Sequence, residues 1–248
     1  MRMSGVTSYE VEYRHGATRM VGQMCVPDAP RGDTAVLLLP DAYGVTGHAI
    51  GLGRRLAEHG RPVLVADLWG ERRLPSGQAE FGPLIGAMAA DRGRWLGRVA
   101  AAHAALLAGP GLGAARVVAL GYCFGGSSAL EHARTGAELA GVISVHGGLD
   151  ILGSDWSAAR PTSVLVCSGA DDPMATPGMR ADLTSAMDTA GVDWQTHLYS
   201  GTVHAFTSPM AKSSPAPDTV SYHARSTGRA WTATLDFLRE TDGAKPTT

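Results

Sequence analysis

The chain has 248 residues, of which 44% are hydrophobic and 18% charged, as is typical of a globular protein, and one large domain of this length can bury a core without help from disulfides or metal. The formal net charge of −2 argues against a nucleic-acid partner, because no basic surplus is available to neutralise phosphates. No apolar stretch approaches the length of a membrane span, and three scattered cysteines exclude a disulfide framework or a zinc site.

The first predicted elements are two strands, 9–13 and 20–26, which a turn at 15–17 joins into an antiparallel pair. The pattern then changes to short continuous apolar runs, as expected of strands that are buried on both faces of a parallel sheet. These runs cover 35–39, 62–66, 117–120, 141–145 and 163–167, and a late strand covers 194–199. Amphipathic segments predict helices near 49–59, 91–108 and 180–190, and a closing helix over 228–239.

Because strand and helix alternate, we predict an α/β fold with a mostly parallel sheet, helices on both faces and antiparallel strands at the N-terminus. No repeat, charge block or long linker divides the chain, so residues 1–248 are expected to form a single domain, with a frayed tail from about residue 242. Ligands of such sheets bind outside the carboxyl ends of the strands. Candidate site residues are therefore expected there.

The most informative motif is the hexapeptide Gly121-Tyr122-Cys123-Phe124-Gly125-Gly126, which follows an apolar run and precedes a predicted helix. A strand that turns sharply into a helix, with a nucleophile at the corner and glycine two residues to either side, is a nucleophile elbow. Side chains at the flanking glycines would collide where strand and helix come close. A cysteine at a helix N-terminus is also favoured as a thiolate. The alternative interpretation is a buried structural cysteine in a glycine-rich turn.

A thiol nucleophile needs a base and a carboxylate that orients the base, and in this fold the expected chain order is nucleophile, acid, histidine. Two carboxylates, Asp171 and Asp172, come just after the strand 163–167, and His204 follows the next strand. All of them reach the sheet edge at which Cys123 is expected. We predict His204 as the base and Asp172 as the acid, with Asp171 as the alternative.

Two other histidines lie at or near strand ends. His146 precedes the aspartates and so breaks the expected order, and His197 lies inside its strand. A single aspartate after a strand is more often a turn former or a helix cap, and a single histidine in a loop is more often solvated. The prediction therefore depends on the three features together.

With these motifs assembled, the chain resembles the dienelactone hydrolase family of α/β-hydrolases over nearly its whole length after the first strands. The residues that carry the resemblance are 40–45, 121–126, 169–173 and 204–209, with Tyr222 and Ala230-Trp231. The resemblance implies an α/β-hydrolase fold and a triad of Cys123, His204 and Asp172, the last of which fits the family's G-x-x-D-P spacing. It also implies that Asp41, one methylene shorter than the glutamate that the family usually has at this position, contacts the nucleophile in the resting enzyme; the alternative is a turn or cap residue.

One departure from the family concerns the substrate. The members that cleave dienelactone have an arginine four residues after the histidine to hold the substrate carboxylate, and here that residue is Ser208. Arg72 and Arg73 are candidates to replace it, although exposed arginines are more often solvated surface. Dienelactone itself is therefore not predicted as the substrate. Pocket shape depends on two segments predicted as loops, 69–81 and 208–221, and the oligomeric state stays open.

The predicted function is hydrolysis of ester or lactone bonds in small molecules through a thioester on Cys123, as in a carboxymethylenebutenolidase-like enzyme, with no metal and no organic cofactor. The developing oxyanion would be held by the backbone N–H groups of Ala42 and Phe124. Three aromatic residues near strand ends are candidates for an apolar substrate pocket, with ordinary core packing as the alternative: Tyr43, Trp69 and Phe206.

Three alternatives remain at this stage. An acyl transferase or an esterase with another acceptor would use the same triad, whereas a non-catalytic small-molecule-binding scaffold would need none of it. A thiol redox protein would need a resolving cysteine, and neither Cys25 nor Cys167 forms a C-x-x-C pair with Cys123. The sequence start lacks the apolar core of a signal peptide, and a working thiol suits a reducing compartment, so a cytoplasmic location is expected, without nucleic-acid or membrane partners.

Overall fold

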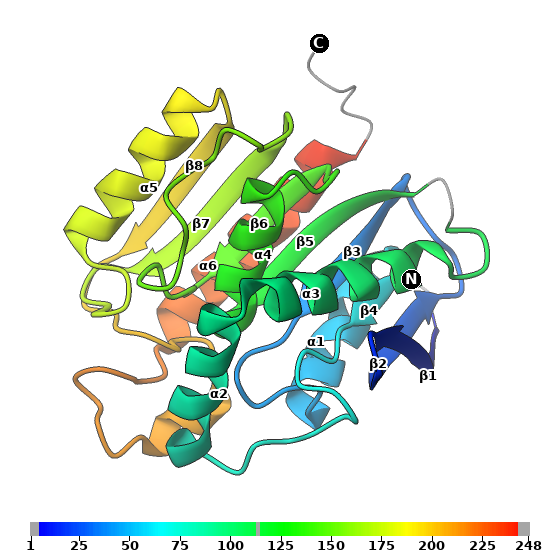
Figure 1. Cartoon of the computed structure of the whole chain (residues 1–248), viewed down its shortest axis with the longest axis horizontal. Helices are drawn as coiled ribbons and strands as arrows, with labels where there is room; N and C mark the ends of the chain where they lie inside the picture. Colours follow the sequence, from blue (N-terminus) through cyan, green and yellow to red (C-terminus); the bar gives the residue numbers. More distant parts are fainter. Residues whose placement is uncertain (1–4, 113–114, 243–248) are drawn as a thin grey trace. The chain divides into compact units, whose positions relative to one another are not determined.

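The computed structural model describes residues 5–112 and 115–242 (Figure 1). Contacts within the chain divide it into two compact units, residues 1–120 and 121–248. The single domain expected over residues 1–248 stays a prediction. The predicted frayed tail, apart from Asp242, lies outside the described residues.

The strands of the first unit change from antiparallel to parallel pairing. They are β1 (Val6–His15), β2 (Thr18–Pro27), β3 (Thr34–Leu39), β4 (Val63–Val65) and most of β5 (Arg116–Tyr122). β1 and β2 form an antiparallel hairpin in which Tyr9 is opposite Met24, and β2 also pairs antiparallel with β4. β4 pairs parallel with β3, with Leu64 opposite Leu37. Every residue of β3 and β4 is buried, which explains their continuous apolar runs.

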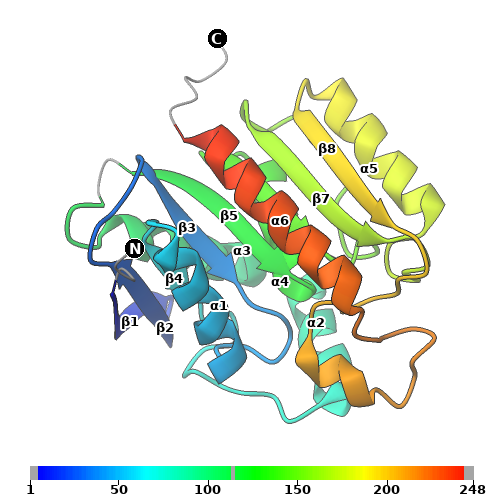
Figure 2. The ribbon, with the colours of Figure 1, turned by 180° about the vertical axis from the view of Figure 1, so that it is seen from behind.

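Helices cover both faces of these strands, as Figures 1 and 2 show from opposite sides. α1 (Gly47–Glu58) packs on the face that carries Cys25, because a Cβ at Gly53 would lie 3.4 Å from the Cys25 sulfur. The neighbouring residue Met24 points to the opposite face, where it shares a groove with α3 (Arg92–Leu107). The buried residues of α3 recur at helical spacing and form its inner face: Trp95, Val99, Ala102 and Leu106.

One helix of the first unit was not predicted. α2 (Gln78–Ala90) begins inside the segment 69–81, so the prediction of a loop is wrong for the last four residues of that segment. Pro83 lies within the helix, and Gly82 and Gly86 flank it. Proline and glycine are poor helix formers, so the sequence of this segment did not predict a helix. Contacts with α3 stabilise α2 in spite of them.

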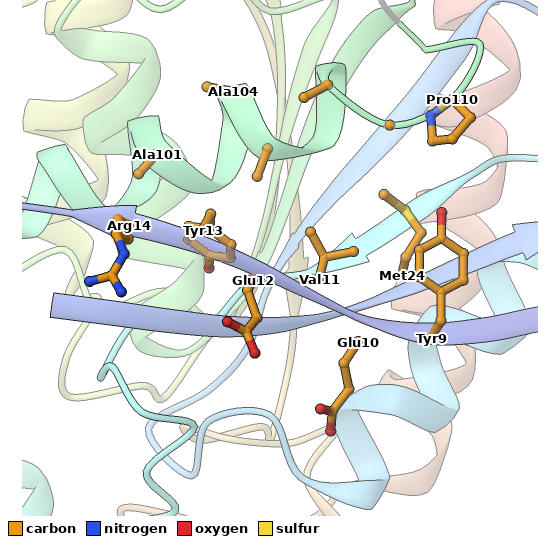
Figure 3. A pocket seen from close by; sticks show the side chains of 13 residues that line it. Tyr9, Glu10, Val11, Glu12, Tyr13, Arg14, Met24, Ala101, Ala104 and Pro110 are labelled. Carbon is orange, nitrogen blue, oxygen red and sulfur yellow. The ribbon is translucent and has the colours of Figure 1, made fainter.

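The groove between β1 and α3 is the cavity drawn in Figure 3, and its volume is about 580 Å³. Tyr9, Val11 and Tyr13 line it from β1, opposite small side chains of α3 that include Ala101 and Ala104. No candidate site residue lines this groove.

The second unit continues the α/β pattern with parallel strands. Its strands are β6 (Gly141–Val145), β7 (Ser163–Gly169) and β8 (Asp193–Tyr199), and its helices are α4 (Phe124–Arg134), α5 (Pro177–Thr189) and α6 (Ala224–Thr241). β7 lies between β6 and β8, with Val164 opposite both Val142 and Trp194. The predicted α/β class, with parallel strands after an antiparallel start, is confirmed.

α4 and α6 lie on opposite faces of the second unit's strands (Figures 1 and 2). A Cβ at Gly141 would meet the Phe237 ring of α6, whereas a Cβ at Gly126 of α4 would meet Ser144. Gly141 and Ser144 are three residues apart on β6 and therefore face opposite sides. This packing leaves the loops after β6, β7 and β8 to form one edge of the unit. The segment 208–221, predicted as a loop, contains one short 3₁₀ helix, η1 (Pro209–Ser213).

Candidate active site

Cys123 stands at the corner between β5 and α4 in a strained backbone conformation. Its φ of 52° and ψ of −121° belong to a region that costs a non-glycine residue about 1–3 kcal/mol. The corner is held because the Cys123 carbonyl oxygen accepts the N–H of Gly126 at 2.8 Å and that of Ser127 at 3.1 Å. A side chain at Gly121 would overlap the carbonyl of Gly125. The hexapeptide thus forms a sharp strand-to-helix turn with the half-buried thiol at its apex.

His204 lies in the loop after β8, and its imidazole is between two other functional groups. Its Nε2 is 3.2 Å from the Sγ of Cys123, and its Nδ1 is 2.9 Å from Oδ2 of Asp172. The backbone of His204 is fixed on both sides, because its N–H donates to the carbonyl of Thr219 and its carbonyl accepts the N–H of Ser221. The ring is buried, so water does not compete with these contacts.

The two aspartates after β7 have different environments. Asp172 is buried, and its Oδ1 accepts the N–H of Met174 at 2.8 Å while Oδ2 faces His204. Asp171 is exposed, and its backbone N–H donates to the carbonyl of Thr202. Asp172 is therefore the carboxylate that the loop brings to the imidazole.

The electrostatics of the site favour a charged histidine. Burial by itself would lower the pKa of His204, but the Cys123 sulfur and the Asp172 carboxylate together raise it to about 10. The imidazolium is thus the favoured form at neutral pH while the sulfur is a thiolate. This arrangement can take a proton from the thiol, hold the ion pair and return the proton to a leaving group.

Four predicted site residues belong to the first unit. Oδ1 of Asp41 accepts the N–H of Tyr43 at 3.0 Å, and burial raises the pKa of Asp41 to about 6. The indole N–H of Trp69 donates to the carbonyl of Ala42 at 3.0 Å. The ring of Tyr43 packs edge-on against Phe81, with centroids 4.7 Å apart. The roles predicted for these residues, as nucleophile contact, oxyanion donor and pocket lining, stay predictions.

The two predicted phenylalanines are buried residues of the second unit. Phe124 is the first residue of α4, so its N–H is among those that no carbonyl of the same helix accepts. Phe206 packs edge-on against the rings of His146 and Tyr199, with centroids 5.1 and 5.5 Å away. Their predicted roles as oxyanion donor and pocket residue stay predictions. Ser208 is buried, and its N–H donates to the carbonyl of Ala205.

The two arginines that were candidates for a substrate carboxylate are paired within the first unit. An Nη of Arg72 is 2.6 Å from a carboxylate oxygen of Glu10, and an Nη of Arg73 is 2.6 Å from one of Glu80. A substrate carboxylate would have to compete with these partners.

His146, which the chain-order argument set aside, lies beside His204. It follows β6 directly, is fully buried, and its ring centroid is 5.5 Å from that of His204. Its Nδ1 accepts the N–H of Cys123 at 3.1 Å, and its Nε2 is 2.7 Å from Oγ1 of Thr207. The signal in the sequence was its place at the carboxyl end of a strand. The expected chain order argued against His146 as the base, but it does not bear on whether His146 lies next to His204.

Within residues 5–112 and 115–242, no group of three or more histidine, cysteine, aspartate or glutamate side chains is arranged to hold a metal ion. None of the helices in this described part of the chain combines the length and the apolar character that crossing a membrane requires. The expected cytoplasmic location and the expected independence from cofactors stay predictions.

Comparisons with known proteins give consistent matches. The model of the "dienelactone hydrolase family" matches residues 20–241. A dienelactone hydrolase-like promiscuous phosphotriesterase from metagenomic libraries is 35% identical, with a TM-score of 0.88 over 96% of this chain and 99% of that one. A dienelactone hydrolase from Anabaena variabilis, 20% identical over 94% and 98% of the two chains, shares the fold with a TM-score of 0.63. An uncharacterized protein of Caenorhabditis elegans is 31% identical over 156 residues, which are 62% of this chain and 98% of that protein.

Proposed function

The chain belongs to the dienelactone hydrolase family, and on that premise we propose that it hydrolyses ester or lactone bonds of small molecules through a thioester on Cys123. One observation carries the proposal: the imidazole of His204 lies 3.2 Å from the cysteine sulfur and 2.9 Å from the Asp172 carboxylate. Nucleophile, base and orienting acid at these distances are what covalent acyl transfer requires.

In the first half-reaction the Cys123 thiolate attacks the carbonyl carbon, and the π electrons move to the carbonyl oxygen. The oxyanion lies near the N-terminus of α4, where we propose that the N–H of Phe124 donates to it. The second donor expected at Ala42 is part of the same proposal. When the carbonyl re-forms, the C–O bond breaks and the leaving alkoxide takes the proton from Nε2 of His204. The acyl group is then held as a thioester.

In the second half-reaction water replaces the alcohol. Acylation removes the negative charge on sulfur that contributes to the raised pKa of His204, so the neutral imidazole becomes available as a base. It takes a proton from water, the hydroxide attacks the thioester, and the C–S bond breaks. The thiolate and the imidazolium are restored, and the acid product leaves.

This chemistry favours a substrate with a good leaving group. A thiolate is expelled from a tetrahedral intermediate more easily than an amine, so attack on an amide mostly reverses, whereas lactones, enol esters and aryl esters go forward. Ser208, at the position where the family's arginine would hold a carboxylate, is buried. The proposed substrates are therefore esters or lactones without a required carboxylate.

The test is hydrolysis of p-nitrophenyl acetate and of a lactone panel by the wild type and by Cys123→Ala and His204→Ala. Each substitution is expected to lower kcat/KM by at least about 10³-fold, because the triad acts as a unit. Mass spectrometry of the quenched wild type should find the acyl group on Cys123. Cys25→Ala, which removes a buried cysteine of the first unit, is the matched control and should keep full activity. Equal rates in all variants, none of them above the uncatalysed rate, would favour the non-catalytic scaffold.

A second candidate activity comes from the 35% identical relative, which is named as a promiscuous phosphotriesterase. The same thiolate would attack phosphorus and expel an aryloxide, and water would then cleave the S–P bond. Diethyl p-nitrophenyl phosphate tests this directly. Release of p-nitrophenol by the wild type but not by Cys123→Ala would add this activity, and release by neither would restrict the enzyme to carboxylic esters.

A further inference from the structure

The backbone N–H of Cys123 has two acceptors, and one of them is an imidazole. It is 3.1 Å from the carbonyl oxygen of Val145 and 3.1 Å from Nδ1 of His146. A nitrogen that accepts a hydrogen bond carries no proton, so neutral His146 must be protonated on Nε2. That N–H then donates to Oγ1 of Thr207, 2.7 Å away.

Thr207 lies three residues after His204 in the same loop. The contacts from Cys123 to His146 and from His146 to Thr207 therefore connect the elbow to the loop that carries the base. This second connection runs beside the direct contact between the Cys123 sulfur and His204. The ring of His146 also packs edge-on against His204, at a centroid distance of 5.5 Å. His146 thus contacts Cys123 and Thr207 through its nitrogen atoms and His204 through its ring.

The surroundings of His146 keep its ring neutral. Burial lowers its pKa well below the usual value, and a positive charge on His204 lowers it further. The ring of the titratable residue Tyr122 also faces it, with its centroid 5.9 Å away. A ring that stays neutral keeps one acceptor and one donor across the working pH range.

We propose that His146 is a positioning residue, which holds the strained corner at Cys123 and, through Thr207, the loop of His204, and so sets the separation of Sγ and Nε2. The inference rests on the function proposed above, because it concerns the efficiency of that triad. It assigns no proton transfer to His146. Its role is geometric, and a shift of about 1 Å between reacting groups costs about 10²-fold in rate.

The backbone of His146 determines which substitutions are informative. Its φ of 42° is left-handed, a region that asparagine tolerates better than other side chains. His146→Asn keeps an acceptor near the position of Nδ1 but loses the contact with Thr207. His146→Leu loses both contacts. Thr207→Val removes only the Thr207 hydroxyl, and Thr207→Ser restores it.

Ser144 supplies a matched control on the same strand. Its side-chain hydroxyl is buried and, among the residues that the structure describes, has no hydrogen-bond partner. Ser144→Ala therefore changes a buried hydroxyl near the elbow without touching the connection through His146. It should behave as the wild type in every assay below.

We expect kcat to fall by about 10²-fold in His146→Leu and by about 10-fold in Thr207→Val, with KM changed by less than about 2-fold. His146→Asn should lie between His146→Leu and the wild type, and Thr207→Ser should be close to the wild type. Circular dichroism and thermal unfolding establish that each variant is folded. If His146→Leu does not fold, the comparison of Thr207→Val with Thr207→Ser tests the proposal.

The decisive readout is the pH dependence of Cys123 alkylation by iodoacetamide, measured by peptide mass spectrometry. In the wild type the sulfur lies 3.2 Å from Nε2 of His204. In His146→Leu and Thr207→Val a loosened contact between sulfur and imidazole should shift the profile. Cys25 and Cys167 are buried and serve as internal references. A fall in kcat with an unshifted profile would indicate a merely structural role and overturn the proposal.

Wild-type kcat and an unshifted profile in both Thr207→Val and His146→Leu would also overturn it. The failure of the proposed function is a separate result, namely full hydrolytic activity in Cys123→Ala. The alkylation profile needs no substrate and therefore tests the positioning of Cys123 in either case.

Discussion

Two buried aspartates follow the carboxyl ends of strands, one in each unit, and their surroundings differ. Asp67, two residues after β4, accepts four backbone N–H groups with its carboxylate, those of Val21, Trp69, Gly70 and Arg72, at 2.8 to 3.0 Å. Asp172 accepts one, from Met174, and its second oxygen faces His204. The same residue type at the same kind of position thus builds a loop in one unit and orients an imidazole in the other.

The difference distinguishes a carboxylate whose hydrogen-bond partners are all backbone donors from one that also contacts a titratable ring. Both oxygens of Asp67 are occupied by backbone donors, and the loop they organise contains Glu71 and Arg72 at positive φ. The hydroxyl of Tyr13 closes the same loop, because it bridges the backbone N–H and carbonyl of Asp67. Asp172 keeps one oxygen for a titratable ring. Burial alone does not separate the two, but the partners of each oxygen do.

The largest expected effect is on catalysis at Asp172. Asp172→Asn should lower kcat for p-nitrophenyl acetate by about 10⁴-fold, because the amide no longer fixes the tautomer of His204 or stabilises its charge. Thermal unfolding should change little, since the residue remains polar and of equal size. A variant with near wild-type kcat would show that Asp172, like Asp67, is only a loop builder.

The complementary substitution, Asp67→Asn, should act on stability. Hydrogen bonds to a charged acceptor contribute more than neutral ones, and an amide nitrogen would face backbone donors, so a loss of about 3 kcal/mol in the free energy of unfolding is expected. Urea unfolding followed by circular dichroism measures it. The folded fraction should keep its kcat. A large fall in kcat without loss of stability would contradict the distinction between the two carboxylates.

A smaller, pH-dependent effect follows from the ion pair at His204. Its pKa in the folded protein, about 10, lies above the usual 6.5, so its contribution to stability is fully present below about pH 6.5 and is lost as pH rises towards 10. The difference in unfolding free energy between the wild type and His204→Gln should therefore shrink over this range. A constant difference from pH 6 to pH 10 would mean that the imidazole is not held as a cation.

Much of the fold could be predicted because its signals are local. The buried parallel strands are continuous apolar runs, and the elbow is a glycine pattern in which a side chain at Gly121 would overlap the backbone of Gly125. Cys123, Asp172 and His204 were expected at one sheet edge because each of them follows the carboxyl end of a parallel strand. α2 was missed because Pro83 and two glycines disguise a helix that tertiary contacts stabilise.

The features that sequence reasoning missed in the site depend on contacts between distant segments. The contacts of His146 are with the N–H of Cys123, 23 residues away, and with Thr207, 61 residues away. The same limit applies to the two carboxylates, because the neighbouring sequence does not distinguish Asp67 from Asp172. One of the donors to Asp67, the N–H of Val21, is 46 residues away. The residue type and its place at a strand end predict where chemistry is possible. The hydrogen-bond partners of each polar atom determine which of these positions can carry it out.

The smallest expected effect concerns Arg73, a candidate for holding a substrate carboxylate. Its ion pair with Glu80 is half exposed, and such pairs contribute little to stability because water and salt screen them. Arg73→Ala should therefore leave thermal unfolding nearly unchanged. It should also leave KM at the wild-type value for a neutral lactone and for the matching lactone that carries a carboxylate, because the guanidinium is already paired with Glu80. A KM that rises only for the carboxylate-bearing lactone would show that the substrate displaces Glu80.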